Sequence, residues 1–155
     1  MPEARWLLRA SAAQIKQLRV TPETIDDLTD KHHFLTYFPL TISFFTTGKV
    51  AMCAALSGLE VIDCPTVVDG ELGIVKPAQV AKLLATLAKL DLKSIARQVE
   101  AAEPKPLAKR GVDDFSIAVG GDKPASALVV ADIAGLIAFY TLVAKRKTGI
   151  VMYTS

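Results

Sequence analysis

The sequence has few of the residues that build metal centres and catalytic sets. Its 155 residues include two cysteines, Cys53 and Cys64, and two adjacent histidines, His32 and His33. Two cysteines supply neither a disulfide framework nor the four ligands of a structural zinc site. The sequence also contains no recognisable Ser-His-Asp or Cys-His arrangement. We therefore expect free thiols, and we expect no metal ion and no cofactor.

The chain also lacks a strong excess of charge of either sign. It has 18 basic and 16 acidic residues and a formal net charge of +2, so we expect no nucleic-acid partner. A hydrophobic content of 51% excludes a disordered chain. The length suits a single domain covering residues 1–155. Glu3, Arg5 and Arg9 interrupt the N-terminal segment, which therefore does not resemble a secretory signal, and we expect a cytoplasmic protein.

One long apolar segment covers residues 125–144 and is followed by three basic residues. It is long enough to span a membrane, but it contains Asp132, and an aspartate at a membrane centre costs about 2.5–3.5 kcal/mol. A helix enclosed by the rest of the fold has the same composition. We favour the enclosed helix and expect no membrane contact, with a membrane span as the alternative. Ile133, Leu136, Ile137 and Tyr140 are the predicted core residues of this helix.

The remaining segments predict an α+β fold, with a small mixed or antiparallel sheet covered by several helices. One of these helices, near the C-terminus, is central and apolar. Ser11 and Gln14 have the spacing of a capping box behind a first strand in which Arg5 and Leu7 share a face. Pro22 opens a helix that we expect to continue through residue 30 towards residue 37. Between residues 40 and 75 we expect a helix over 40–47, a helix within 50–57 and short β-prone runs within 59–75. Farther along the chain we expect a helix over 77–90 and a second helix that ends near residue 102. A loop over 103–111, a short strand or irregular segment over 115–121 and a terminal strand over 150–153 complete the chain.

Several of these segments, in this order, match a family pattern. They are WLLRAS followed by AAQI at residues 6–15, ISFFTTG at 42–48, LGIVKPAQV at 72–80, LIAFY at 136–140 and GIVMY at 149–153. Together they resemble the YfbM-like family of small bacterial proteins of unknown function. The resemblance implies a cytosolic bacterial protein with an α+β fold, and it implies no particular reaction.

The chain departs from that family pattern in front of its Thr-Gly pair. Members of the family carry an Asp-Lys pair and a Trp-His pair on the helix before this point. Counting back from Gly48 places Thr36 and Tyr37 at the first pair and Pro39 and Leu40 at the second. For this reason, no functional residue is transferred from the family to this chain.

The candidate site residues are Asp30, His32, His33 and Tyr37. On a helix, Asp30 and His33 are three positions apart and His33 and Tyr37 are four apart, so they can share a face. A carboxylate that orients an imidazole can produce a general base or a metal ligand. However, adjacent histidines point about 100° apart on a helix, and the usual spacing of two metal-binding histidines is four residues.

Two functions therefore remain open from the sequence. The first is a non-catalytic module that binds a protein or a small molecule, because no catalytic set is assembled. The second is a small enzyme or metal-binding protein that uses the four candidate residues.

The scattered cysteines and histidines predict that folding needs no metal ion. Protein incubated with excess EDTA should melt at the same temperature as untreated protein in differential scanning calorimetry. A large drop in melting temperature, reversed by adding back a divalent metal, would contradict this prediction and favour the metal-binding alternative.

Overall fold

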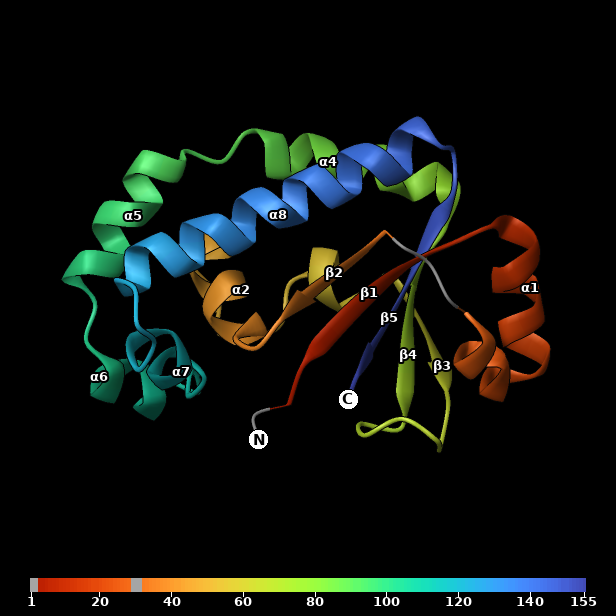
Figure 1. Cartoon of the computed structure of the whole chain (residues 1–155), viewed down its shortest axis with the longest axis horizontal. Helices are drawn as coiled ribbons and strands as arrows, with labels where there is room; N and C mark the ends of the chain where they lie inside the picture. Colours follow the sequence, from red (N-terminus) through yellow and green to blue (C-terminus); the bar gives the residue numbers. More distant parts are fainter. Residues whose placement is uncertain (1–2, 29–31) are drawn as a thin grey trace.

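The computed structural model describes residues 3–28 and 32–155, which form a five-stranded antiparallel sheet with helices packed around it (Figure 1). The order of the strands across the sheet is β2-β1-β5-β4-β3. The fold class is therefore α+β, as predicted. The strands are β1 (Arg5–Ala10), β2 (His33–Thr36), β3 (Glu60–Asp63), β4 (Glu71–Val75) and β5 (Gly149–Thr154).

The two ends of the chain meet at the centre of the sheet. β5 lies between β1 and β4, and its register with β1 runs from Arg5 opposite Thr154 to Ala10 opposite Gly149. Beyond the strands, the backbones of Ala4 and Ser155 exchange two further hydrogen bonds of 3.0 and 2.9 Å. The predicted terminal strand is therefore confirmed, and it is a central strand of the sheet.

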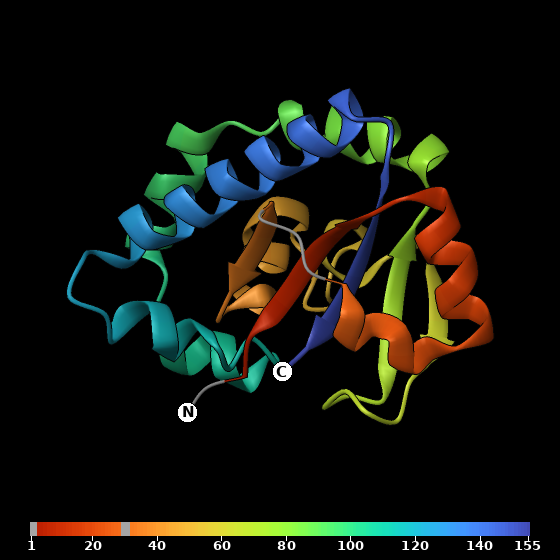
Figure 2. The same ribbon diagram turned by 45° about the vertical axis from the view of Figure 1, so that its right-hand side comes forward.

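Helices cover both faces of the sheet (Figures 1 and 2). Leu7 of β1 joins the large core cluster that includes α8, whereas the next residue, Leu8, joins a second cluster with Ile15 and Leu18 of α1. This alternation follows from the two-residue period of a strand. The helices are α1 (Ala12–Val20), the 3₁₀ helix η1 (Pro22–Asp27), α2 (Pro39–Thr47), α3 (Ala54–Ser57), α4 (Pro77–Ala88), α5 (Leu92–Ala101), α6 (Pro104–Lys109), α7 (Phe115–Val119) and α8 (Ala125–Lys145).

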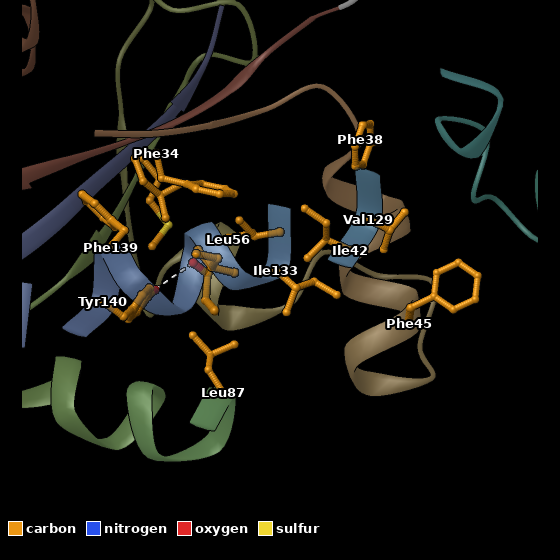
Figure 3. Close-up of a cluster of buried hydrophobic side chains, with 14 of the residues drawn as sticks. Phe34, Phe38, Ile42, Phe45, Leu56, Leu87, Val129, Ile133, Phe139 and Tyr140 are labelled. Atoms are coloured by element: carbon orange, nitrogen blue, oxygen red, sulfur yellow. Dashed lines mark hydrogen bonds between the residues drawn. The ribbon is translucent and has the colours of Figure 1, made fainter. Parts of the chain in front are cut away.

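Helix α8 is the principal core helix, and it lies alongside α4 and α5 (Figures 1 and 2). Ile133, Leu136 and Tyr140 are fully buried, and Ile137 is half-buried. The Tyr140 hydroxyl donates a hydrogen bond of 2.7 Å to the carbonyl oxygen of Ala55 (Figure 3). By length and composition, α8 is a candidate membrane span, but an enclosed core helix meets the same criterion.

The one carboxylate inside the apolar segment has a hydrogen-bond partner. The Thr36 hydroxyl of β2 donates to Asp132 Oδ2 at 2.7 Å, and Thr36 Oγ1 in turn accepts from the backbone N–H of Phe38. Burial raises the pKa of Asp132 above its ordinary value, and the hydrogen bond from Thr36 partly opposes this effect. The pair joins the edge strand β2 to α8.

Several local predictions from the sequence are confirmed. Ser11 and Gln14 form the reciprocal capping box that begins α1, with hydrogen bonds of 3.1 and 2.8 Å. The helix predicted over 40–47 is α2, which begins one residue earlier, with Pro39 in a first turn where its missing N–H costs nothing. Gly48 ends α2 at a φ of +75°, a left-handed conformation that favours glycine.

The predicted helix through residues 22–37 is wrong. The segment begins as η1, but this 3₁₀ helix ends at Asp27, and by His33 the chain is a strand paired with β1. Phe34 points into the core and lies next to Gly135 of α8, so burial against the sheet and α8 outweighs the local helical spacing. Within residues 50–57, only Ala54–Ser57 is helical.

Two further predictions are wrong near the C-terminal half. The segment expected to be a loop contains α6, which has Pro104 in its first turn, and the segment expected to be a strand or irregular forms α7. A proline in the first turn of a helix is well tolerated, because the backbone N–H that it lacks has no partner within the helix at that position. Leu107 and Phe115 of these helices are buried in the main core, which explains why such short helices persist.

The position of Leu136 predicts a large loss of stability on truncation. Leu136→Ala should lower the free energy of unfolding by about 2–5 kcal/mol, because it leaves a cavity between α8 and the sheet. Urea unfolding followed by circular dichroism measures this difference. The control is Ala131→Ser on the exposed face of α8, which should change stability little. Equal stabilities for both variants would contradict the assignment of α8 as the core helix.

Candidate functional site

The structure separates the residues that the sequence grouped as a candidate site. His33 is exposed on β2, where its ring lies 5.3 Å from the ring of Trp6. Tyr37 follows β2 and lines a cavity that does not include His33. His32 is half-buried outside that cavity, and Asp30 lies outside the described residues. His33 and Tyr37 therefore do not share one face of a helix, although the sequence predicts this arrangement.

A cavity of about 400 Å³ is lined by residues near both ends of the chain and by residues of α2 and α7. A second hollow of about 210 Å³ shares Arg5 and Met52 with it and continues towards β3 and β4. We call the two together the Arg5 groove. The larger cavity is lined by Glu3, Arg5, Tyr37, Pro39, Leu40, Met52, Asp113, Asp114, Ser116, Ile117 and Thr154.

Arg5 is the most deeply buried charged residue of the groove, with 5% of its surface exposed. Its Nε donates to the carbonyl oxygen of Leu56 at 2.8 Å, and its Nη1 donates to Asp69 Oδ2 at 3.1 Å and Thr154 Oγ1 at 3.2 Å. Within the described residues, Nη2 donates no hydrogen bond. Burial lowers the pKa of Arg5, and the Asp69 carboxylate opposes this effect.

The backbone around Arg5 explains how so large a side chain fits beside the sheet. A Cβ atom at Gly73 of β4 would collide with the carbonyl oxygen of Ser57 and would lie 3.5 Å from Arg5 Nη2. Only glycine leaves room for this close approach of α3 to the sheet. Arg5 then reaches across Gly73 to the C-terminal end of α3, where free carbonyl groups favour a cation.

Asp114 also lines the larger cavity of the groove, and it holds the start of α2. Its carboxylate accepts hydrogen bonds from the backbone N–H groups of Leu40 and Thr41 at 2.8 and 2.9 Å, and from the Thr41 hydroxyl at 2.6 Å. A carboxylate at a helix N-terminus satisfies free N–H groups and complements the helix dipole. Burial nevertheless raises the pKa of Asp114, and the three hydrogen bonds only partly counter it.

The remaining lining combines apolar surface with free acidic groups. Leu40, Met52 and Ile117 are half-buried and pack against the main core. Tyr37 is exposed to 42% of its surface, and Asp113, the neighbour of Asp114 in the sequence, is also exposed. The groove therefore offers an apolar floor, an aromatic ring and carboxylates to a ligand.

The two partly or fully buried charged groups of this lining are held by the fold itself. Arg5 and Asp114 are both engaged in hydrogen bonds that hold the fold together, and the two histidines lie outside the lining. A general base needs a side chain that is free to exchange a proton with its substrate. Among residues 3–28 and 32–155, no three His, Cys, Asp or Glu side chains gather as a metal site would require.

The sequence did not reveal Arg5 and Asp114 as site residues. One available signal was the strand alternation that places Arg5 on the same face as the core residue Leu7, since an arginine on a buried face needs partners. No comparable local signal exists for Asp114, because the helix that it caps begins far away in the sequence.

No family model matches the chain, and no curated protein matches it by sequence. The fold is similar to that of YfbM from Escherichia coli, a protein of unknown function, with a TM-score of 0.67 at 14% sequence identity. The match covers 98% of this chain and 99% of that chain. Likeness at this identity shows a shared fold, in agreement with the fold that the sequence resemblance implied, and a shared fold carries no reaction.

The cap formed by Asp114 predicts a stability difference between two substitutions. Asp114→Ala should lower the free energy of unfolding by about 1–3 kcal/mol, because the N–H groups of Leu40 and Thr41 lose their acceptor. Asp114→Asn keeps one acceptor oxygen and should lose less. Asp113→Asn at the exposed neighbour is the matched control and should change stability little.

The same substitutions predict a pH dependence. Because the folded pKa of Asp114 is raised, its contribution to stability is fully present below the unfolded pKa of about 3.9 and is lost as pH rises through the folded value. Asp114→Asn should remove this loss, which is measured as the difference between wild type and variant in urea unfolding from pH 4 to pH 7. A difference that is constant across this range would contradict the assignment.

Proposed function

We propose that the protein is a non-catalytic binding module and that the Arg5 groove is its ligand site. The observation that carries the proposal is the convergence of Arg5, Asp114 and Tyr37 on a cavity of about 400 Å³. Ligand sites are typically concave, largely apolar and about 300–1,000 Å³ in volume, with a few polar groups that orient the ligand. Groups whose pKa values are displaced by burial also gather at such sites.

The rigid support of the groove favours this function. Arg5 is held by hydrogen bonds to three separate segments, and Asp114 is held by the first turn of α2. A site whose side chains are already fixed loses little conformational entropy when a ligand binds.

The enzymatic or metal-binding alternative uses Asp30, His32, His33 and Tyr37, of which Asp30 lies outside the described residues. In the structure, His33 contacts Trp6 on the sheet, whereas Tyr37 contributes to the groove. No described observation joins the two into one site, so we propose binding as the function.

The proposal is tested by blocking the groove. Wild-type protein is screened by thermal shift against a panel of amino acids, amines, sugars and nucleotides, and hits are measured by isothermal titration calorimetry. Ser116→Tyr should weaken a hit at least tenfold, because Ser116 is an exposed lining residue and the larger ring fills the cavity. Val20→Tyr is the matched control on α1, where Val20 is 78% exposed and lies outside the lining.

Two results would contradict this proposal. The first is that no panel compound raises the melting temperature. The second is that a hit binds Ser116→Tyr as tightly as wild type. The non-catalytic part of the proposal is tested separately, by mass spectrometry of the hit after prolonged incubation, in which the compound should remain unchanged.

A further inference from the structure

We infer that the Arg5 groove binds a basic amino acid, either free or as a residue of a peptide. This inference rests on the function proposed above and specifies the ligand of the same site. The ligand would place its cationic group among the acidic residues of the groove and its methylene stem on the apolar floor. Its carboxylate or carbonyl oxygen would accept a hydrogen bond from Arg5.

The charge of the groove is opposite in sign to that of the whole chain. Among the described residues, the lining of the larger cavity includes three acids, Glu3, Asp113 and Asp114, and no lysine. Arg5, the cation of this described lining, is paired with Asp69, and the adjoining hollow adds Glu71. The chain as a whole carries +2. A concave site lined by one sign of charge concentrates the opposite ion, so the groove favours a cation and repels an anionic ligand.

The aromatic ring of the groove favours an organic cation. Tyr37 is 42% exposed and lies in the same lining as Asp113 and Asp114. Ammonium and guanidinium groups are attracted to the face of a tyrosine ring, whereas a hydrated metal ion gains more from a compact cluster of oxygen ligands. The described residues contain no such cluster of potential metal ligands.

The apolar floor suits the stem of a lysine or arginine side chain. Leu40, Met52 and Ile117 present half-buried apolar surface in the same lining as the carboxylates and Arg5. Basic side chains lay their methylene groups along apolar surface while the charged end reaches polar groups. An amine without a stem would leave this surface uncovered.

One N–H donor of Arg5 is open to a ligand in the groove. Arg5 is 5% exposed and lines both hollows of the groove, yet its Nη2 donates no hydrogen bond within the described part of the chain. Nη2 is reached by solvent, because among the described residues the fully buried side-chain N or O atom without a partner is Thr148 Oγ1. A carboxylate or carbonyl oxygen on a ligand in the groove can therefore accept a hydrogen bond from Nη2, and a basic amino acid carries such an oxygen at the other end of its stem.

Isothermal titration calorimetry with a matched set of probes tests the ligand class. L-Arginine and L-lysine should bind, whereas L-norleucine, which keeps a stem without the cation, should bind at least tenfold more weakly, and L-glutamate should not bind. Agmatine, which lacks the carboxylate, should bind more weakly than L-arginine. Capped Gly-Arg-Gly and Gly-Lys-Gly peptides distinguish the two sources: tighter binding than the free amino acid assigns the site to a peptide, and weaker binding assigns it to the free form.

Charge-neutralising variants test the location of the cation. Glu3→Gln combined with Asp113→Asn should weaken the tighter of L-arginine and L-lysine at least tenfold and reduce its dependence on salt, because both side chains are exposed in the lining. Glu100→Gln combined with Asp122→Asn is the matched control, since these exposed acids lie outside the groove. Circular dichroism spectra should be unchanged in both double variants.

Either of two results overturns the inference. One is that L-norleucine binds as tightly as L-lysine, or that no basic probe binds. The other is that the two double variants bind the basic probe equally well. The proposed binding function survives either result if another panel compound binds and Ser116→Tyr blocks it, so the two failures are distinguishable.

Discussion

The pairing of β1 with β5 is the constraint on which the rest of the structure depends. These strands come from opposite ends of the chain and lie at the centre of the sheet, with β2 outside one of them and β4 and β3 outside the other. Without β5, the sheet would divide into two separate strand pairs, and α8 would lose the strand into which it leads. Contacts between such distant segments close a long loop, so this topology predicts slower folding than that of a helical bundle.

The Arg5 groove is a consequence of the same pairing. Arg5 begins the first strand and Thr154 ends the last one, and their hydrogen bond exists only because the two strands are in register. Asp69, from the turn between β3 and β4, completes the environment of the guanidinium. A buried charge is tolerated only where partners surround it, and those partners come from segments that must already be folded. The site therefore depends on the completed sheet.

The parts of the fold that the sequence predicts are those specified by nearby residues. The apolar run of α8, the capping box at Ser11 and the left-handed end of α2 at Gly48 are all local signals, and the structure confirms them. The local sequence predicts a helix at His33, whereas the structure has a strand there, because pairing with β1 and burial of Phe34 decide its conformation. The groove could not be predicted as a unit, because Arg5, Tyr37 and Asp114 are ordinary in their local sequence and meet only through tertiary contacts. Tyr37 was a candidate from the sequence, but its neighbours in the groove are not those expected.

The ligand of the groove is determined by the side chains that line it, and not by the net charge of the chain or by the fold. A net charge of +2 says nothing about a hollow in which Glu3, Asp113 and Asp114 gather. The fold shared with YfbM at 14% identity is maintained by buried apolar positions that many sequences can fill. The groove residues are under a different constraint, because each must present a particular charge or ring to the cavity. Two proteins can therefore share this sheet and its helices while their grooves favour different ligands, and the function must be sought in the side chains of the groove.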